Sequence, residues 1–187
     1  VVGGYDANIN TAVKFLVDKS IMGINVIESA RRAGVTQLIN LASSCMYPRG
    51  GKNPLSEEQI LTGSLEPTNE GYALAKITTT RLCEYISRTT PNCQYRTLIP
   101  CNLYGRYDKF DPEEAHMIPA VIRKIHEAKR ARDKVVTIWG DGTARREFMY
   151  ASDLADFVFF SLGRFSALPQ TLNVGLGKDY SINEYYQ

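Results

Sequence analysis

Three residues in the first half of the chain have side chains that can act together on a carbonyl group. Ser43 follows an apolar run, and Tyr72 and Lys76 lie four residues apart near the start of an expected helix. Residues at this spacing share one helix face, and an ammonium group near a phenol favours the phenolate and lowers the tyrosine pKa. We therefore expect Tyr72 to donate a proton to a carbonyl oxygen that the Ser43 hydroxyl also polarises.

A tyrosine and a lysine at this spacing also occur as an ordinary helical pair, so the elements around them matter. The apolar pattern predicts strands over 35–42, 96–100, 134–139 and 171–174, alternating with helices over 20–33, from 69 to about 87, around 118–125 and over 152–162. This alternation predicts an α/β fold with a doubly wound parallel sheet and right-handed crossovers. In such sheets ligands bind beyond the carboxyl ends of the strands, which is where Ser43 stands.

Three shorter signals mark the ends of elements. Gly34 follows the first helix as a C-cap, and Gly140-Asp141-Gly142 predicts a turn. Ser181 and Glu184 have the spacing of a capping box that opens a last helix.

Composition excludes several classes of protein. The 187 residues are 44% hydrophobic with a formal charge of +2, which suits a globular fold and gives no general attraction to nucleic acid. No apolar run reaches the ~18 residues of a membrane span. The four cysteines form no CxxC pair and read as reduced thiols of a cytoplasmic protein, and two histidines are too few for a His-rich metal site, so no metal is expected. A basic cluster over 123–134 is interrupted by Glu127 and Asp133 and reads as a solvated helix end.

The glycines and the two ends of the sequence suggest a part of a longer polypeptide. None of the 14 glycines forms GxGxxG, so the sequence contains no pyrophosphate loop for a dinucleotide. The chain opens on Val1-Val2-Gly3-Gly4, like the end of a strand, and closes one turn into a helix. We expect the full polypeptide to extend in both directions.

Two runs resemble a known family. Ser-Ser-Cys-Met-Tyr-Pro at 43–48 and Leu-Glu-Pro-Thr-Asn-Glu-Gly-Tyr-Ala-Leu-Ala-Lys at 65–76 are similar to the extended short-chain dehydrogenase/reductases, and within them to the GDP-L-fucose synthase family. Segments 102–105, 116–120 and 139–148 continue the similarity over essentially the whole chain. The resemblance implies that 1–110 is the later part of a Rossmann-like NADP-binding domain. It also implies a small substrate-binding subdomain over 111–187, with a strand and helix at about 147–175 that return to the Rossmann sheet.

The resemblance also implies roles for individual residues. Ser43, Tyr72 and Lys76 match the family's catalytic triad, and Cys45 and His116 match the base and acid of its epimerisation. The chemistry suits these types, because C3 and C5 of the sugar both flank the C4 ketone and one site that stabilises the enolate serves both. The family's cofactor, NADPH, would lie against Ser43, Tyr72, Lys76, Pro100, Asn102, Leu103 and His116. The GDP-sugar would contact Asn102, Met117, Val121, Lys124, Ile138, Trp139 and Arg146.

These implications leave alternatives open. Taken alone, Cys45 reads as a small buried side chain, His116 as a surface residue at a helix start, and Trp139 as a core residue at a strand end. Lys124 stands where the family commonly has arginine, and it keeps the charge without the bidentate geometry.

The resemblance implies the conversion of GDP-4-keto-6-deoxy-D-mannose to GDP-L-fucose, or to a closely related GDP-sugar, with no nucleic acid or membrane as a partner. It also implies a homodimer built on a four-helix contact, to which we expect the helices over 13–33 and 72–87 to contribute. The alternatives are a nucleotide-sugar 4-epimerase or 4,6-dehydratase, and a non-catalytic nucleotide-sugar-binding protein.

Overall fold

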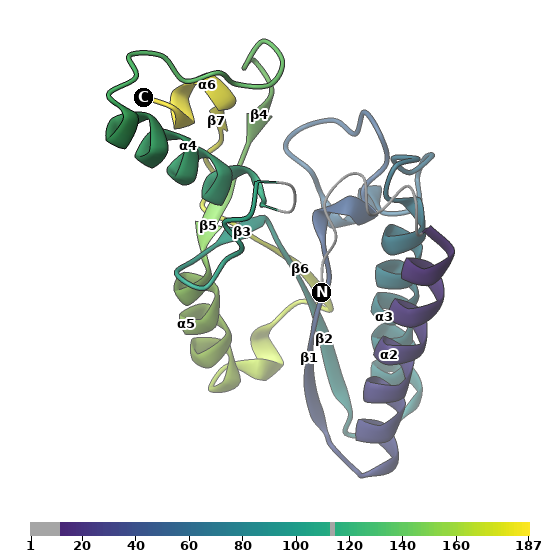
Figure 1. Ribbon diagram of the computed structural model, residues 1–187. Helices are drawn as coiled ribbons and strands as arrows, with labels where there is room; N and C mark the ends of the chain where they lie inside the picture. Colours follow the sequence, from purple (N-terminus) through teal and green to yellow (C-terminus); the bar gives the residue numbers. More distant parts are fainter. Residues whose placement is uncertain (1–11, 113–114) are drawn as a thin grey trace.

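The computed structural model describes residues 12–112 and 115–187 (Figure 1). The expected strand end at Val1–Gly4 lies outside these residues. In chain order the helices are α2 (Ala12–Arg32), α3 (Glu70–Thr89), α4 (Met117–Ala131), α5 (Ala151–Leu162) and α6 (Ile182–Tyr185), with 3-10 turns at Ser44–Met46, Glu57–Gln59 and Phe165–Ala167. The strands are β1 (Gln37–Leu41), β2 (Gln94–Pro100), β3 (Asn102–Tyr104), β4 (Arg145–Arg146), β5 (Phe148–Tyr150), β6 (Thr171–Val174) and β7 (Tyr180–Ser181).

A parallel sheet with the order β1-β2-β6 is the centre of the fold. Its central strand β2 is buried on both faces, as expected of a parallel sheet covered by helices on both sides. Tyr95 packs with Ile27 of α2 and Ile86 of α3, whereas Leu98 packs with Leu154 of α5. Figure 1 shows α2 and α3 together on one side of this sheet and α5 on the other. The fold is therefore Rossmann-like, as the sequence predicted.

Two smaller sheets lie beyond the carboxyl ends of the central strands. β3 pairs in parallel with β5, and β4 pairs antiparallel with β7. Along the chain, α4 lies between β3 and β4. After α5 the chain returns to the central sheet as β6, beside β2. The boundary expected near residue 110 between a cofactor domain and a substrate subdomain stays a prediction.

Most predicted elements are confirmed, and one is wrong. Gly34 has the left-handed φ of +76° that ends α2, and Ser181 with Glu184 forms the capping box of α6. The strand expected over 134–139 is absent from the described residues, where this segment is an irregular connection. Val135 is 80% exposed and Trp139 88% exposed, so the apolar pattern there does not mark a buried strand.

Two further observations bear on the class of protein. Within the part of the chain that the structure describes, no helix has the length and apolar character required to cross a bilayer. All four cysteines are free thiols.

Gly23 allows α2 to approach α3 closely. A Cβ atom at position 23 would collide with Cγ2 of Thr79, a buried residue of α3. Alanine normally favours a helix over glycine by ~1 kcal/mol, but forcing extra volume into packed helices costs ~1–3 kcal/mol. We expect Gly23→Ala to lower the free energy of unfolding, measured by urea denaturation.

Thr79→Ser provides the matched background, since serine has no Cγ2. In that background Gly23→Ala should be neutral or stabilising, because the next nearest atom, Cβ of residue 79, is at an ordinary 3.6 Å. Equal destabilisation in both backgrounds would show that the collision is not the cause.

Candidate active site

The Ser43 turn starts directly at the carboxyl end of β1. The Ala42 amide still donates to the Leu98 carbonyl (2.8 Å), which continues the ladder between β1 and β2 by one residue. Ser43 is the N-cap of the turn Ser44–Met46, and its hydroxyl accepts from the Cys45 amide (3.5 Å). The sheet therefore places Ser43 and Cys45 together at its rim.

Tyr72 and Lys76 approach this turn from the first two turns of α3. The Lys76 ammonium lies 5.7 Å from the centre of the Tyr72 ring and donates to the carbonyl of Leu41, the last residue of β1 (2.8 Å). The Ser43 hydroxyl lies near enough to the Tyr72 phenol to lower its pKa, against the larger effect of burial. The structure thus brings four predicted residues, Ser43, Cys45, Tyr72 and Lys76, into one cluster.

Burial dominates the electrostatics of this cluster. It raises the pKa of Tyr72 to about 12, with a further rise from Cys45 and a smaller opposing effect of the Ser43 hydroxyl. It also raises the pKa of the Cys45 thiol, which Ser43 and Lys76 offset in part, and lowers the pKa of Lys76.

The expectation that Lys76 lowers the Tyr72 pKa is wrong for this structure. The ammonium is directed at the end of β1, and burial of the phenol, the largest effect, disfavours the phenolate and raises the Tyr72 pKa. Tyr72 is consequently a protonated acid at neutral pH.

A first cavity, of ≈ 800 Å³, opens beside Ser44 at the ends of β2 and β6. Pro100, Asn102 and Arg146, all predicted to contact cofactor or substrate, line it. Asn102 is fixed there because its side-chain amide donates to the carbonyl of Glu147 (3.0 Å). The lining of this first cavity also includes residues that the sequence did not single out, among them Tyr47, Asn173 and Lys178. The sequence feature that could have identified Asn173 is a polar amide side chain inside an otherwise apolar strand.

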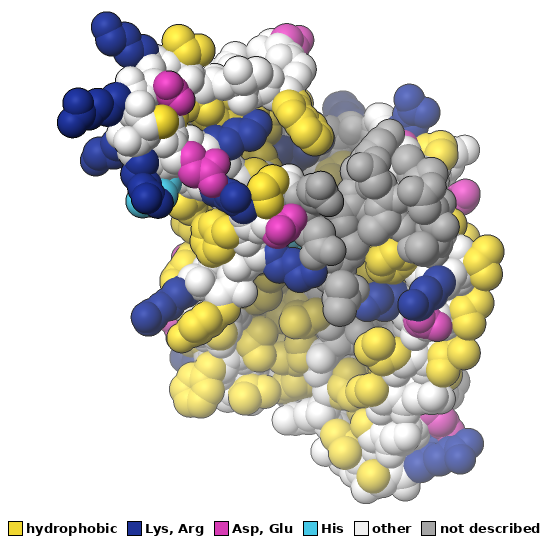
Figure 2. All heavy atoms as spheres, in the orientation of Figure 1, with side chains coloured by type: hydrophobic (Ala, Val, Ile, Leu, Met, Phe, Trp, Pro, Cys, Tyr) yellow, Lys and Arg dark blue, Asp and Glu magenta, His cyan; other side chains and the backbone are white. Residues whose placement is uncertain are grey.

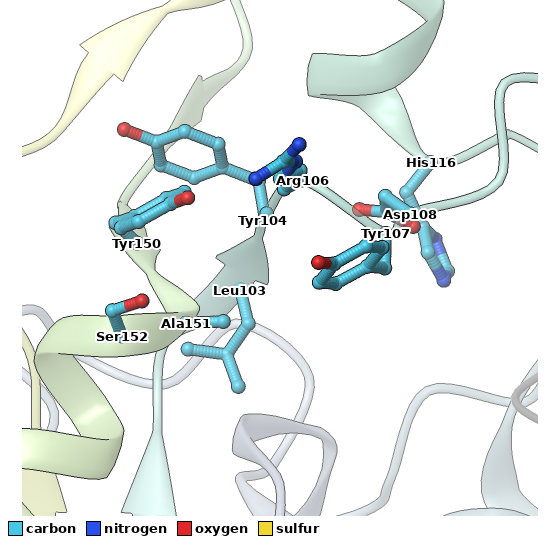
Figure 3. Close-up of a pocket in the computed structure, with 10 residues that line it drawn as sticks. Leu103, Tyr104, Arg106, Tyr107, Asp108, His116, Tyr150, Ala151 and Ser152 are labelled. Atoms are coloured by element: carbon cyan, nitrogen blue, oxygen red, sulfur yellow. The ribbon is translucent and has the colours of Figure 1, made fainter.

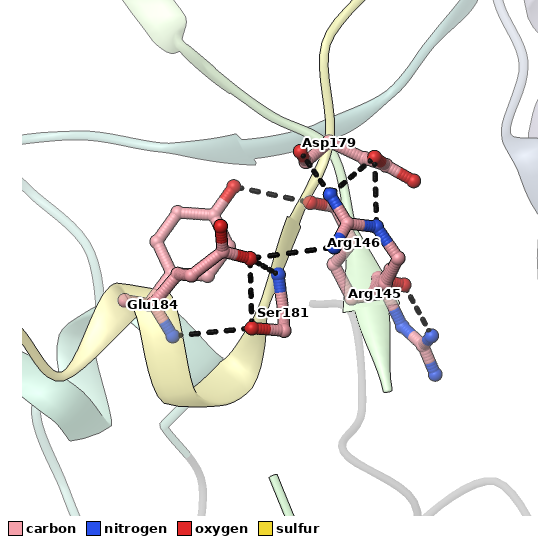
Figure 4. A network of polar contacts seen from close by, with 6 residues as sticks. Arg145, Arg146, Asp179, Ser181 and Glu184 are labelled. Carbon is pink, nitrogen blue, oxygen red and sulfur yellow. Dashed lines mark hydrogen bonds and ion pairs between the residues drawn. The ribbon is translucent and has the colours of Figure 1, made fainter. Parts of the chain in front are cut away.

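Two adjacent arginines have different surroundings at this cavity (Figure 4). Arg145 pairs with Asp179 (3.0 Å) and Glu184 (3.4 Å), which ties β4 to β7 and α6. Arg146 donates only to the Arg145 carbonyl (2.7 Å), and no acidic side chain of the described residues pairs with it. Arg146 therefore keeps its charge available to an anion, and a guanidinium can bind two phosphate oxygens at once.

A second cavity, of ≈ 600 Å³, lies at the carboxyl ends of β3 and β5. Asn102 lines the first cavity, whereas Leu103 and Tyr104 line the second, where the rings of Tyr104 and Tyr150 pack at a tilt with their centres 5.4 Å apart (Figure 3). His116, the N-cap of α4, contributes to this second cavity. No described contact joins His116 to Cys45 or Tyr72, so the structure does not place it in their cluster.

The remaining predicted residues lie on and beside α4. Val121 is buried and Met117 and Ile138 are half-buried. The Lys124 ammonium donates to the Thr137 carbonyl (3.1 Å) and lies 5.8 Å from the centre of the Trp139 ring. The exposure of Trp139 excludes the core role that its sequence position also allowed. Figure 2 shows the basic side chains of this region gathered on the surface over α4.

Comparison with known proteins defines the family. The profile of the NAD dependent epimerase/dehydratase family matches residues 1–175, and the chain belongs to this family. It is 59% identical over its full length to a GDP-L-colitose synthase of Yersinia pseudotuberculosis and 52% identical over 186 residues to a GDP-L-fucose synthase of Azorhizobium caulinodans. It covers 61% and 59% of those proteins, so it spans about three fifths of the curated relatives.

Solved structures support the same assignment. A GDP-mannoheptose C4 reductase from Campylobacter jejuni with NADP bound superposes with a TM-score of 0.88 at 29% identity, over all of this chain and 65% of that one. A GDP-L-fucose synthetase from Naegleria fowleri gives a TM-score of 0.83 at 25% identity, over 95% of this chain and 56% of that one. The Rossmann-like fold is thus shared with enzymes of GDP-sugar metabolism.

Proposed function

We propose that this chain is the central part of an NADPH-dependent GDP-sugar 3,5-epimerase and 4-reductase. Its expected substrate is GDP-4-keto-6-deoxy-D-mannose, with GDP-L-fucose as the product, or a closely related ketone that leads to GDP-L-colitose. The observation that carries the proposal is the cluster of Ser43, Cys45, Tyr72 and Lys76 at the rim of the sheet. Cys45, whose backbone amide donates to the Ser43 hydroxyl, adds a thiol to a reductase site, and its thiolate would act as a base.

The reduction step uses Tyr72 and Ser43. Their hydroxyls would hold the C4 oxygen, and Tyr72, protonated because of its raised pKa, would give that oxygen its proton. Ser43, Tyr72, Lys76, His116 and the segment Pro100–Leu103 would hold NADPH, which supplies the hydride when bound. The residues fit this group, since Lys76 is already anchored by Leu41 at the strand end where a ribose and nicotinamide would lie.

The epimerisation step uses Cys45 and His116. The Cys45 thiolate would remove the proton next to the ketone while Tyr72 and Ser43 stabilise the enolate oxygen. His116 would return a proton from the opposite face of the sugar. His116 lines the second cavity and has no described contact with the Cys45 cluster, so this step requires that both side chains face one sugar ring when the substrate is bound.

The nucleotide would bind beyond the first cavity. Arg146 would pair with the diphosphate, and Asn102 would contact the sugar at the cavity wall. Lys124 and Trp139, with Met117, Val121 and Ile138 beneath them, would hold the rest of the GDP group from α4.

A reductase without epimerase activity is the second candidate. Two observations favour it: the separation of His116 from the Cys45 cluster, and the structural similarity to a C4 reductase. The natural full-length polypeptide should be supplied with GDP-4-keto-6-deoxy-D-mannose and NADPH in D2O, and the product compared with authentic GDP-L-fucose and GDP-L-colitose.

The outcomes separate the candidates. NADPH consumption with deuterium at C3 and C5 supports the proposal, and consumption without deuterium supports a simple reductase. Tightly held NAD with no net NADPH consumption indicates a 4-epimerase or 4,6-dehydratase. Binding of GDP without binding of NADPH indicates a non-catalytic protein.

We also propose a homodimer formed through α2. Val13, Val17 and Ile21 recur at helical spacing and are 77%, 46% and 54% exposed. Figure 2 shows hydrophobic side chains along the edge of the molecule where Figure 1 draws α2. Such a continuous apolar stripe on an outer helix is typical of an interface.

Ile21→Lys should therefore convert the dimer to a monomer in light scattering, with little loss of stability because the side chain is exposed. Ala155→Lys, at an exposed position of α5 on the opposite side of the sheet, is the matched control and should stay dimeric. A wild-type monomer, or a dimer in both variants, would contradict this interface.

A further inference from the structure

Asn173 joins β6 to three points of the loop that follows the Ser43 turn. Its side-chain oxygen accepts from the Tyr47 hydroxyl (2.6 Å), and its side-chain amide donates to the Leu55 carbonyl (3.0 Å). Its backbone N–H donates to a Glu57 carboxylate oxygen (2.6 Å). We call these four residues and their three hydrogen bonds the Asn173 latch.

The Asn173 latch is attached to the central sheet. Asn173 is paired with Ile99 in the parallel ladder between β2 and β6, so its backbone is held by the sheet. Tyr47 is buried, with 6% exposure, and packs with Ile99 in the core cluster around Met46. Tyr47 is therefore held both by packing and by a short hydrogen bond to Asn173.

Tyr47 is also the end of the turn that carries Cys45. It is the C-cap of Ser44–Met46, and its amide donates to the Ser44 carbonyl (3.2 Å). The other end of the turn is fixed independently, because Ala42 remains in the ladder to Leu98 (2.8 Å). The sheet thus fixes the Ser43 end of the turn and the latch fixes the Tyr47 end. Cys45 stands midway between them, so its position depends on both ends, whereas Ser43 depends mainly on the sheet.

The hydroxyl of Tyr47 stays protonated and keeps its hydrogen bond to Asn173. Burial and the nearby Glu57 carboxylate raise the pKa of Tyr47 to about 12, although the hydrogen bond to Asn173 opposes the rise. The phenol consequently stays protonated and donates to Asn173 throughout the neutral range.

From this geometry we propose that Asn173 is a positioning residue, which acts through Tyr47 to hold Cys45 in place for proton removal. This inference rests on the proposed function and adds that the two reactions depend unequally on the latch. Loosening the latch should displace Cys45 more than Ser43, so epimerisation should suffer more than reduction.

Tyr47→Phe is the principal test, because it keeps the buried ring and removes one hydrogen bond. With the natural full-length polypeptide, deuterium exchange at C3 and C5 should fall by ~10-fold or more, since small displacements of a reacting group reduce rates strongly. Reduction of the already epimerised ketone should fall by less than ~3-fold, with the exchange defect in kcat rather than KM.

Asn173→Ala tests the latch from its other side. Alanine removes both side-chain hydrogen bonds of the latch, so exchange should fall at least as far as in Tyr47→Phe. Tyr85→Phe, at a half-exposed site on α3, is the matched control and should leave both rates unchanged. Equal losses of exchange and reduction in Tyr47→Phe, or full exchange in a folded Tyr47→Phe or Asn173→Ala variant, would overturn the proposal.

A second readout does not depend on the proposed function. Alkylation of Cys45 by iodoacetamide, followed by mass spectrometry, reports the setting of the thiol directly. Its rate should change by ~5-fold or more in Tyr47→Phe and remain unchanged in Tyr85→Phe, since thiol reactivity follows local access and pKa. If the wild-type protein shows no exchange at all, the epimerase function is wrong, and an unchanged alkylation rate would then independently overturn the latch.

Discussion

Hydride transfer should slow by ~100-fold or more when Tyr72 is replaced by phenylalanine, because a positioned proton donor contributes an effect of this size. The ring would still pack beside Lys76, but the hydroxyl that gives its proton to the C4 oxygen would be missing. The raised pKa of Tyr72, about 12, keeps this acid fully protonated at neutral pH, so its whole contribution is lost. Single-turnover oxidation of NADPH in the presence of the ketone measures the step.

Two controls make the Tyr72 result specific. GDP affinity should be unchanged, since the nucleotide is expected to contact Arg146 and α4 rather than α3. Tyr85→Phe removes a hydroxyl from the same helix and should leave hydride transfer intact. A decrease of less than ~3-fold in Tyr72→Phe would remove this residue from the proton-donor role.

Cys45→Ser should abolish exchange at C3 and C5 while reduction of the epimerised ketone persists. A serine hydroxyl ionises far less readily than a thiol, so little of the deprotonated base would be present. We therefore expect exchange to fall by ~100-fold or more. Cys93→Ser, at a half-buried thiol near the start of β2, is the matched control and should retain exchange. Unchanged exchange in Cys45→Ser would assign the base to another residue.

The two reactions should also differ in their dependence on pH. The active form of Cys45 is the thiolate, and burial raises the pKa of this thiol, so under conditions in which proton removal limits the rate, exchange should increase by ~10-fold per pH unit across the neutral range. The active form of Tyr72 is the protonated phenol, which persists up to its pKa of about 12, so reduction should stay level over the same range. An exchange rate that is independent of pH would contradict a thiolate base.

Local sequence signals were sufficient for most of the fold. The apolar spacing of α3, the glycine after α2 and the capping box of α6 each depend on neighbours within a few residues. The parallel direction of the strands in the central sheet also followed from the alternation of strands and helices, whereas their order in the sheet was not predicted. The segment 134–139 shows the limit of such patterns, since an apolar run forms a strand only where another strand pairs with it.

The site was predictable where it depends on position in a strand or a helix. Ser43 at a strand end and Tyr72 four residues before Lys76 were found in this way, and the structure brings them together. The raised pKa of Tyr72 depends on how deeply the phenol is buried, and the Asn173 latch joins residues 126 positions apart, so local spacing contains neither. The division of the surroundings of β3 into two cavities is likewise a result of tertiary packing.

The doublet Arg145-Arg146 has a consequence for mutational scanning. The guanidinium of Arg145 is neutralised by acidic side chains of the fold and that of Arg146 is not, so substitutions at the two positions should affect different properties. In a library of variants selected for folded protein, only Arg145 should resist substitution. In a library selected for catalytic turnover, both Arg145 and Arg146 should resist substitution. Comparing the two scores would show which charge serves the architecture and which serves the ligand.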